Sequence, residues 1–462
     1  MFARFVQIET SLLRPTTAIR MIDWLRGQRL GREPEERFMN SSTLVATLAI
    51  TSLAPITFAG DVNPPPGPVD GTMKTLDEVR PSTPMNVDTT PGDANSTFRI
   101  TAPGAYHLIA NLTGESGKSG IEIAADDVTI NLNGFVIEGV SKSLDAITTD
   151  DTPQSLDEHD RIVITNGAIT GWDGRGVYLN GLNHRVSNLT VESCGNLGIF
   201  VGQNAHVTDC LVSANGLNGI TAGFNSLIAR CVAKDNSGTG IACGFGQFTE
   251  DGGSIIDCNA SGNISGISIG RGGTIARCSA SFNGNAGITL NEGATLTNSN
   301  ADRNGTGVLA RSGSLIDGCA IYANAGDGID AENSRGVSIL DCAVKSNQGH
   351  GILIGASIVV RGNICESNAM AGIRAEFIGI SNSGQNRISG NTCIDNDQGI
   401  SIGTTDNLVI GNACSANSTN WSLIPGNAVA PIVAVTTNVA GINGDTYAGP
   451  FGATDPHANI TY

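Results

Sequence analysis

Charged side chains recur in the middle of the chain at spacings that can place them on one surface. Arginine binds the carboxylates of acidic sugars, and carboxyl groups transfer protons, so together these residue types can act on an acidic sugar polymer. The alternative interpretation is a solvated face, where surface ion pairs add little stability. Arg311 and Glu332 stand 21 residues apart, so we expect them to lie within ion-pair reach on this face. An enzyme would need a cleft in which Arg271, Arg311 and Arg374 converge. The full set of candidates is Arg271, Glu292, Arg311, Asp330, Glu332, Arg374 and Glu376.

A second group of acids lies in the segment 145–160. Calcium binds clustered carboxylates, which makes Asp150, Asp151, Asp157 and Asp160 candidate Ca²⁺ ligands. An ordinary solvated acidic loop is the alternative. No other cofactor is expected, because the chain has neither a Cys-x-x-Cys zinc pair nor a Gly-Gly-x-Gly-x-Asp calcium repeat. Trp172 and Tyr178 are candidates for stacking on sugar rings, although packing would also account for both.

The elements that position these residues are repeats of about 21 residues. A glycine followed by Ile or Val opens each unit, and five of the ten intervals counted from Gly176 are 21 residues long. Each unit also carries a Cys, Asn or Ser followed five residues later by Asn, as in Cys210 and Asn215 or Ser299 and Asn304. A fixed period of this length indicates a stack of similar units. The units open at Gly198, Gly219, Gly240, Gly266, Gly287, Gly307, Gly328, Gly351, Gly372 and Gly399.

Within the units, small apolar and polar residues alternate, as in residues 226–232, and no stretch shows helical spacing. The period is too short for helical repeats, and the leucine-rich pattern is absent. What remains is a β-solenoid with three short strands and three bends in each turn. Stacked turns place equivalent residues about 4.8 Å apart, so the recurrent Asn should form a ladder of side-chain amides and Ile or Val an aliphatic ladder inside.

Cysteine follows the same repeat. Six of the 11 cysteines form one column and Cys365, Cys393 and Cys414 form another. Stacked residues keep their Cβ atoms near 4.8 Å apart, beyond the roughly 3.5–4.5 Å that a disulfide needs. We therefore expect buried thiols that pack as small hydrophobes.

The ends of the chain differ from the repeats. Residues 41–59 are uncharged and apolar and end before a proline-rich run, which predicts a secretory signal cleaved near Ala59, with Met39 as the expected start. An uncleaved membrane anchor is the alternative. The expected organisation is an extension with the signal at 1–59, a Pro/Thr-rich linker and lead-in at 60–104, about 13 coils at 105–420, and a capping tail at 421–462.

Composition excludes some partners. The formal net charge is −17, and removing the signal would make it more negative, which argues against nucleic acid or an anionic membrane surface. We expect a secreted or cell-surface monomer, with no lipid contact beyond the signal segment.

The repeat resembles that of right-handed parallel β-helix proteins of the pectin-lyase-like superfamily, and most closely its uncharacterised secreted bacterial members. The resemblance covers residues 72–462 and rests on residues 72–79, 104–114, 120–135, 166–172 and 458–462. It implies an all-β, single-stranded right-handed parallel β-helix and export. The superfamily includes lyases, hydrolases, epimerases and adhesins, so the resemblance leaves the activity open. Asp455-Pro456-His457 is similar to the tripeptide of alginate epimerases but lies beyond the last repeat.

Two hypotheses follow. The sequence supplies no complete catalytic constellation, which favours a non-catalytic β-helix that binds a polysaccharide or cell-envelope glycan or serves as a rigid spacer. The alternative is an extracellular polysaccharide-active enzyme of the uronan lyase or epimerase type, with its site on the charged face.

Overall fold

The computed structural model describes residues 82–149, 159–244, 252–376, 384–434 and 455–462. All of them belong to one compact unit, Met73–Tyr462. The expected start at Met39 and the signal segment 41–59 lie outside the described residues. In the part of the chain that the structure describes, no helix is long and apolar enough to cross a membrane.

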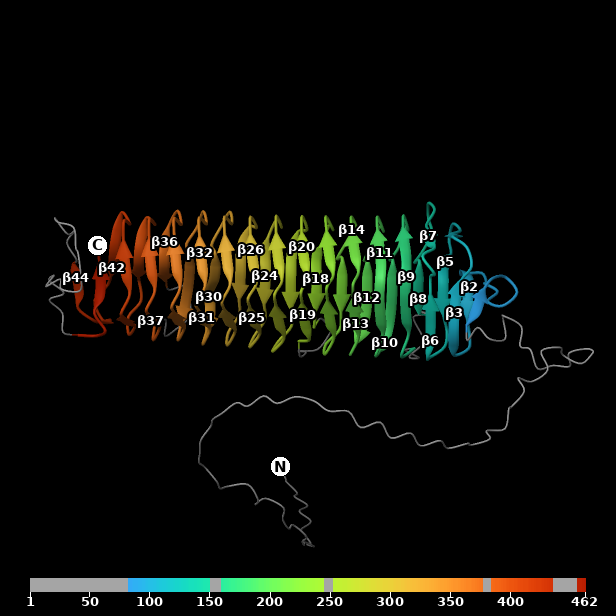
Figure 1. The fold of residues 1–462 in the computed structure, drawn as a ribbon, viewed down its shortest axis with the longest axis horizontal. Helices are drawn as coiled ribbons and strands as arrows, with labels where there is room; N and C mark the ends of the chain where they lie inside the picture. The colour runs from blue at the N-terminus through green and yellow to red at the C-terminus, as the bar shows by residue number, and fades with distance from the viewer. Residues whose placement is uncertain (1–81, 150–158, 245–251, 377–383, 435–454) are drawn as a thin grey trace, which may run out of the picture. The chain divides into compact units, whose positions relative to one another are not determined.

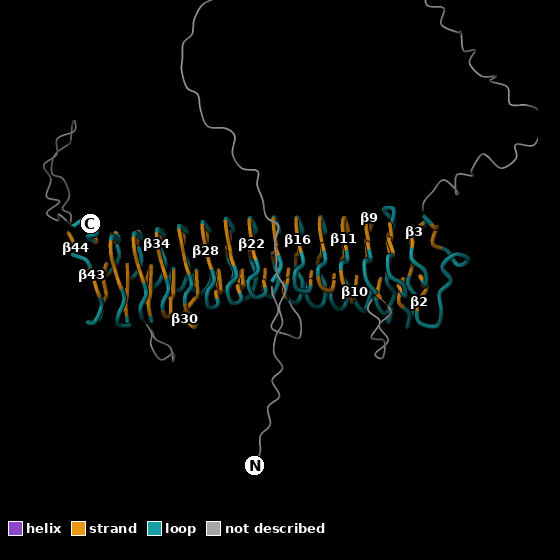
Figure 2. The backbone as a smooth tube through the Cα atoms, turned by 90° about the horizontal axis from the view of Figure 1, so that it is seen from below, coloured by secondary structure: helices purple, strands orange, loops and turns teal. Residues whose placement is uncertain are grey.

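The described chain winds into a parallel β-solenoid, in which each typical coil gives one strand to a 15-stranded sheet and two strands to a 30-stranded sheet. Figure 1 shows the strands of successive coils side by side, and Figure 2 shows the bends that join them. The expected fold is confirmed, with about 15 turns rather than 13. The count rises because β2, which precedes the expected span 105–420, and β42, at its end, also pair in the 15-stranded sheet.

The 15-stranded sheet consists of β2 (Ser96–Ile100), β5 (Ser119–Ile123), β8 (Ile147–Thr149), β10 (Val177–Leu182), β12 (Ile199–Gln203), β15 (Ile220–Ala222), β18 (Thr239–Cys243), β21 (Ser265–Ile269), β24 (Ala286–Leu290), β27 (Thr306–Ala310), β30 (Ile329–Arg335), β33 (Ile352–Ala356), β36 (Ala371–Ala375), β39 (Gln398–Ile402) and β42 (Thr419–Leu423).

The 30-stranded sheet begins with β1 (Thr83–Met85), β3 (Gly104–Leu108), β4 (Leu112–Thr113), β6 (Val128–Asn131), β7 (Val136–Glu138), β9 (Val163–Thr170), β11 (Arg185–Glu192), β13 (His206–Thr208), β14 (Leu211–Ser213), β16 (Leu227–Ala229), β17 (Val232–Lys234), β19 (Ser254–Ile256), β20 (Asn259–Ser261), β22 (Thr274–Ala276) and β23 (Ser279–Ser281). It continues with β25 (Thr295–Thr297), β26 (Asn300–Asp302), β28 (Leu315–Asp317), β29 (Ala320–Tyr322), β31 (Ser338–Leu340), β32 (Ala343–Lys345), β34 (Val359–Arg361), β35 (Ile364–Glu366), β37 (Arg387–Ser389), β38 (Thr392–Ile394), β40 (Leu408–Ile410), β41 (Ala413–Ser415), β43 (Ala428–Val429), β44 (Ile432–Ala434) and β45 (Asn459–Thr461).

The interior is filled by columns of aliphatic side chains. Ile267, Ile288 and Val308 are register partners in β21, β24 and β27, and each is almost fully buried. Alternation along a strand turns every second side chain inward. The aliphatic ladder expected after each opening glycine is therefore confirmed.

A ladder of asparagine side chains fixes one bend of every repeat. The Oδ1 atom of Asn304 accepts hydrogen bonds from the backbone N–H of Asn283, at 3.0 Å, and from its Nδ2, at 2.9 Å. The Nδ2 atom of Asn304 donates in turn to the Ala280 carbonyl, at 3.0 Å, and to Asn324 Oδ1, at 3.2 Å. These bonds satisfy buried polar groups that would otherwise be costly. The predicted ladder is confirmed and includes Asn215, Asn236, Asn263, Asn283, Asn304, Asn324, Asn347, Asn368, Asn396 and Asn417.

The ladder also explains the opening glycines and the backbone of the bend. A Cβ on Gly219 would lie 2.8 Å from Asn236 Nδ2, so the ladder amide occupies the space a side chain would need. The residue before each ladder position has a positive φ, for example 54° at Asp235 and 53° at Arg303. Such a backbone costs about 1–2 kcal/mol for an L-residue, and the ladder bonds offset that cost.

The main cysteine column also joins successive coils through hydrogen bonds, which are weaker because sulfur is a poor donor and acceptor. The Cys231 thiol donates to the Ala229 carbonyl at 3.3 Å, and the Cys231 backbone N–H donates to Cys258 Sγ at 3.4 Å. All 11 cysteines are buried and free, as predicted. Burial raises the pKa of the Cys243 thiol to about 12, which keeps it protonated at neutral pH.

Removing one rung should destabilise the solenoid strongly. Asn304→Ala leaves the buried N–H of Asn283 without its acceptor, so we expect a loss of about 2–4 kcal/mol of unfolding free energy. Urea denaturation followed by circular dichroism measures the loss. The matched control is Asn300→Ala, on the exposed side of β26, which should change stability by less than about 0.5 kcal/mol. Equal effects of the two substitutions would contradict the role of the ladder.

Candidate functional site

One column of outward side chains runs along the middle of the 15-stranded sheet, and we call it the central column. Its residues are register partners from coil to coil, so neighbours lie about 4.8 Å apart. Its composition changes along the sheet, from aromatic and charged at the first coils, through small side chains, to charged again. The column consists of Arg99, Glu122, Thr148, Tyr178, Phe200, Thr221, Ala242, Ser268, Thr289, Leu309, Asp330, Leu353, Arg374, Ser401 and Ser422.

A groove lies beside the first part of the central column, where the preceding bend meets the sheet. Its volume is about 690 Å³, and ten of its twelve lining residues are polar or charged. The exposed Lys142 has no side-chain hydrogen bond or ion pair with a described residue. The groove therefore offers a free cation among hydroxyl and amide groups. It is lined by Asn95, Ser119, Glu122, Lys142, Ser143, Leu144, Asp145, Thr148, Asp173, Gly174, Arg175 and Asn196.

The floor of this groove is held by an ion pair that continues into a stack of rings. Arg175 Nη2 lies 2.7 Å from Asp145 Oδ2, and Arg175 Nε lies 3.0 Å from the same oxygen. The guanidinium carbon lies 3.4 Å from the centroid of the Tyr178 ring. Tyr178 stacks in turn on Phe200, with centroids 4.9 Å apart. The next residue of the central column, Thr221, is small, so no ring covers Phe200 from that side.

The two aromatic candidates from the sequence separate in the structure. Trp172 is 1% exposed, and its Nε1 donates to the Ile137 carbonyl at 3.2 Å. Its ring is therefore part of the core, and the expectation that it stacks on a sugar is wrong. Tyr178 lies beside the groove, but Arg175 and Phe200 contact its ring. Phe200 was not predicted from the sequence, although Tyr178 and Phe200 each stand two residues after an opening glycine.

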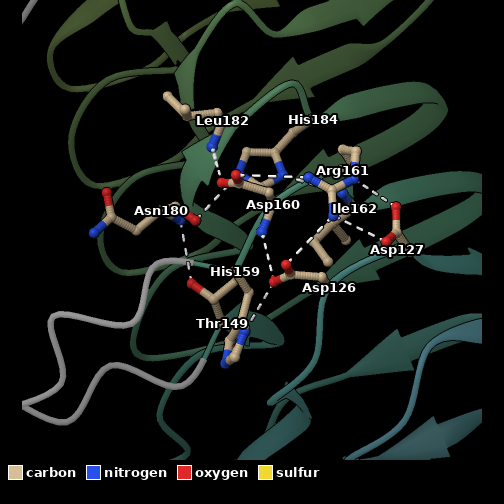
Figure 3. Close-up of polar contacts among 10 residues, drawn as sticks. All are labelled: Asp126, Asp127, Thr149, His159, Asp160, Arg161, Ile162, Asn180, Leu182 and His184. Carbon is tan, nitrogen blue, oxygen red and sulfur yellow. Dashed lines mark hydrogen bonds and ion pairs between the residues drawn. The ribbon is translucent and has the colours of Figure 1, made fainter.

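The structure describes both ends of the acidic segment, residues 145–149 and 159–160. Asp150, Asp151 and Asp157 lie outside the described residues, so their role as calcium ligands stays a prediction. Asp160 lies with Asp126 and Asp127 around Arg161 (Figure 3). Arg161 Nε is 2.5 Å from Asp127 Oδ1, Nη2 is 3.4 Å from Asp126 Oδ2, and Nη1 is 3.7 Å from Asp160 Oδ2.

Arg161 thus supplies the positive charge at this end of the loop. Its hydrogen bond lowers the pKa of the Asp127 carboxyl. In the described ranges, no group of three or more His, Cys, Asp or Glu is arranged to hold a metal ion.

His184, in the same close-up, is a structural residue rather than a catalytic one. Its Nδ1 accepts the Ile162 N–H at 3.3 Å and its Nε2 donates to the Asn180 carbonyl at 3.1 Å (Figure 3). The side chain is fully buried. Burial lowers the pKa of His184 to about 4, which keeps the ring neutral.

The seven charged candidates do not form one site. Arg271 pairs with Glu292 at 2.7 Å. Arg311 has no ion pair with a described residue, so its expected pairing with Glu332 is wrong. The reason is that the register between the two strands ends at the pair Leu309 and Asp330. Arg271 follows β21 and Arg374 lies in β36, five coils or about 24 Å further along the sheet. The three arginines therefore do not converge on one cleft.

A smaller cluster does form on β30, β33 and β36. Arg374 Nη2 lies 3.1 Å from Glu376 Oε1, and Arg374 Nη1 donates to Ser401 Oγ at 2.5 Å. Glu332 and Glu376 follow buried register partners two coils apart, and Gly355 lies between them, with no side chain. Two coils correspond to about 10 Å.

Asp327 and His350, which were not predicted from the sequence, also belong to this cluster. Asp327 Oδ1 accepts the His350 backbone N–H at 2.6 Å, and His350 Nδ1 accepts the Ala371 N–H at 3.1 Å. Both residues stand immediately before an opening glycine in consecutive coils, which is the signal that could have found them. A second groove of about 380 Å³ lies nearby, lined by Ser265, Gly284, Asn285, Ala286, Thr289, Gly305, Thr306, Leu309 and Asp330.

The cluster separates the pKa values of its carboxyl groups. Burial, and then the charges of Asp330, Glu376 and Asp327, raise the pKa of Glu332. The hydrogen bonds from Arg374 lower the pKa of Glu376. Burial lowers the pKa of His350. A carboxyl that is harder to ionise therefore lies near one that is ionised more readily, which is an arrangement suited to proton transfer.

The structure predicts a pH dependence of stability through His184. Its pKa falls from 6.5 in the unfolded chain to about 4 in the fold, so stability is lost as the pH drops from 6.5 to 4. At 1.36 kcal/mol per unit the loss is about 3 kcal/mol. His184→Asn should remove it, because Asn386 occupies the equivalent bend position and its Oδ1 accepts the Ile358 N–H at 2.8 Å.

Urea denaturation at pH 7 and pH 4.5 compares wild type, His184→Asn, and the exposed-site control His206→Asn. The control should keep the wild-type pH dependence. An identical acid loss in all three proteins would show that His184 does not cause it.

The family model for the right-handed β-helix region matches residues 119–250 and 243–378. No curated protein matches the chain. Among solved structures, the A-module of the mannuronan C-5 epimerase AlgE4 from Azotobacter vinelandii is 14% identical over 71% of this chain and 91% of its own, with a TM-score of 0.37. The Dettilon tailspike protein is 14% identical over 65% and 62%, with a TM-score of 0.40.

The periplasmic alginate epimerase AlgG is 10% identical over 70% of this chain and 80% of its own, with a TM-score of 0.33. Likenesses this low carry no argument about function. The family model covers more than half of the chain, and the strand register repeats the same architecture from β2 to β42. The chain belongs to the right-handed β-helix family.

Proposed function

We propose that this protein binds a polysaccharide, without acting on it chemically, along the outward face of the 15-stranded sheet. The groove of about 690 Å³ beside the Tyr178–Phe200 ring pair carries the proposal. Sugars bind through hydroxyl groups that meet polar side chains and through C–H faces that meet aromatic rings, and this surface supplies both. A straight column of stacked coils also suits a polymer, because successive coils present outward side chains at a regular spacing of about 4.8 Å.

The charged residues of the groove restrict the class of polysaccharide that it can bind. Asp145 is neutralised by Arg175, and Glu122 lies 2.9 Å from Arg99. Asp173 accepts the Lys142 backbone N–H at 2.6 Å. Among the described residues, the Lys142 ammonium and the Asp173 carboxylate are the charged groups of the groove without an ion-pair partner, so a polymer that carries both carboxylate or sulfate groups and hydroxyl groups can meet both. In keeping with this ligand and with the apolar segment 41–59, we propose that the protein works as a secreted or cell-surface monomer.

Affinity electrophoresis of the full chain in gels containing alginate, polygalacturonate or dextran tests this proposal. Lys142→Gln should weaken binding to the carboxylated polymers by about three- to tenfold, because one partly exposed ion pair contributes roughly 1 kcal/mol. The control is Lys234→Gln, at the end of β17 in the other sheet, which should not alter binding. No retardation in any gel, or equal retardation of both variants, would refute the assignment of the groove.

A second candidate function is proton transfer on an acidic polysaccharide by the cluster of Glu332 and Glu376. The specific observation is the raised pKa of Glu332 beside the lowered pKa of Glu376. Glu376 would act as the base and Glu332 as the acid, while Arg374 holds Glu376 in place at 3.1 Å. Gly355 leaves room for a sugar between the two carboxyl groups.

Incubation with alginate and polygalacturonate, followed by absorbance for unsaturated products and NMR for epimerised residues, tests this candidate. Activity should fall below the pKa of Glu376 and above the raised pKa of Glu332. Glu332→Gln should abolish it, and Glu292→Gln, paired with Arg271 on an earlier coil, should retain it. A wild-type chain that binds these polymers and leaves them unchanged would remove this candidate and leave the binding proposal intact.

A further inference from the structure

The second groove of the 15-stranded sheet, about 380 Å³ in volume, is lined by polar side chains that the fold does not use. The hydroxyl groups of Ser265, Thr289 and Thr306 form no hydrogen bond with a described residue. The same holds for the side-chain amide of Asn285, which is exposed. The volume lies within the range of about 300–1,000 Å³ that small-molecule sites occupy. The groove therefore combines room for a ligand with hydrogen-bonding groups that are available to it.

Two glycines on consecutive coils keep this groove open. A Cβ on Gly305 would lie 2.6 Å from the Gly284 carbonyl oxygen, so the packing of the coils requires glycine there. At Gly284 the fold makes no such demand, because a Cβ would meet only the Ile264 carbonyl oxygen, at the ordinary contact distance of 3.6 Å. The φ of Gly284 also lies outside the left-handed region. A side chain at this position would therefore be tolerated by the fold and would take up part of the groove.

One charged side chain lines the groove. Asp330 lies in the central column of the sheet, beside its register partner Leu309 on β27. Its Oδ1 atom accepts the Glu332 N–H at 3.0 Å, and the carboxylate has no ion pair with a described residue. Leu309, which also lines the groove, supplies an apolar surface next to the carboxylate. The groove thus presents one uncompensated negative charge and an apolar side chain among neutral polar groups.

The residues around Asp330 add to its negative potential. Burial, and then neighbouring charges that include Asp330, raise the pKa of Glu332, and burial together with the charge of Asp330 raises the pKa of Asp327. Of the arginines nearby, Arg374 is already ion-paired, and Arg311 follows β27 and does not line the groove. A cation at Asp330 would relieve this repulsion, so electrostatic complementarity favours a positively charged ligand.

We propose that this groove binds one unit of an amino sugar, with the protonated amino group on the Asp330 carboxylate. The ammonium donates charge-assisted hydrogen bonds to that carboxylate, the ring hydroxyl groups meet the unused hydroxyl and amide groups, and a C–H face of the ring packs on Leu309. The groove shares no lining residue with the groove that contains Lys142, and this binding involves no proton transfer. The proposal is therefore independent of both functions proposed above.

Isothermal titration calorimetry of the full chain with the trimer of glucosamine tests this proposal, at about pH 6, where amino groups with a pKa near 8 are protonated. Asp330→Asn keeps an acceptor for the Glu332 N–H and removes the charge, so affinity should fall about two- to fivefold, as expected for one exposed ion pair. Gly284→Leu should also weaken binding, because its side chain takes up part of the groove. The matched control Asp317→Asn removes the same charge from β28 in the other sheet and should bind like wild type.

The trimer of N-acetylglucosamine gives the second half of the test, because acetylation removes the ammonium charge and keeps the ring. Wild type should bind the acetylated trimer about two- to fivefold more weakly than the glucosamine trimer. Asp330→Asn should bind the two trimers equally, because it lacks the carboxylate that distinguishes them.

Urea midpoints close to that of wild type establish that the variants fold. The proposal is overturned if wild type does not bind the glucosamine trimer, or if Asp330→Asn and Gly284→Leu bind it as tightly as wild type. Equal weakening by Asp317→Asn and Asp330→Asn would show that net charge alone attracts the trimer. Competition by spermidine as strong as that by the trimer would assign the groove to simple amines. Either of these last two results would also overturn the proposal.

Discussion

The asparagine ladder is the interaction on which the rest of the structure depends. From Asn236 to Asn417, each ladder Oδ1 accepts two hydrogen bonds from the coil before it, and Asn215 Oδ1 accepts the Cys194 N–H, so these positive-φ bends carry no unsatisfied buried N–H. The ladder also fills the space next to each opening glycine, as Asn236 does beside Gly219. The positive-φ bends, the opening glycines and the asparagine ladder therefore depend on one another. Cysteine thiols and His184 serve equivalent bends by the same means, a side chain that accepts a backbone N–H from the preceding coil.

Because the inward side chains stabilise the fold, the outward positions can differ from coil to coil. The residues that could bind or act on a ligand stand at these outward positions. The central column of the 15-stranded sheet passes from Tyr178 and Phe200 through small residues to Asp330 and Arg374. Both grooves lie beside this column where the preceding bend meets the sheet. A coil spacing of about 4.8 Å then determines which side chains meet. Glu332 and Glu376, for example, lie two coils apart with Gly355 between them.

The sequence predicts the fold well because stacking imposes the same requirement on every coil. The Asn and Cys columns, the aliphatic interior and the β-solenoid follow from spacing alone, and only the number of coils changes, since β2 and β42 are less regular. The site is harder to predict because outward residues obey no repeat. Arg311 and Glu332 stand one repeat of 21 residues apart, yet they do not form an ion pair, because their strands lose register before these positions. Trp172 is conspicuous in the sequence but buried, whereas Asp327, His350 and Phe200 gain their roles only from contacts with residues of adjacent coils.

The central claim is that a polysaccharide binds to outward residues of the 15-stranded sheet while the ladder beneath stays unchanged. Hydrogen exchange measured by mass spectrometry on the full chain, with and without alginate oligomers, tests it most directly. The account predicts slower exchange in peptides that cover residues 142–148 and 173–178, and no change along the ladder positions from Asn283 to Asn347. Protection spread evenly over all coils, or absent from the groove peptides while binding is saturated, would contradict it.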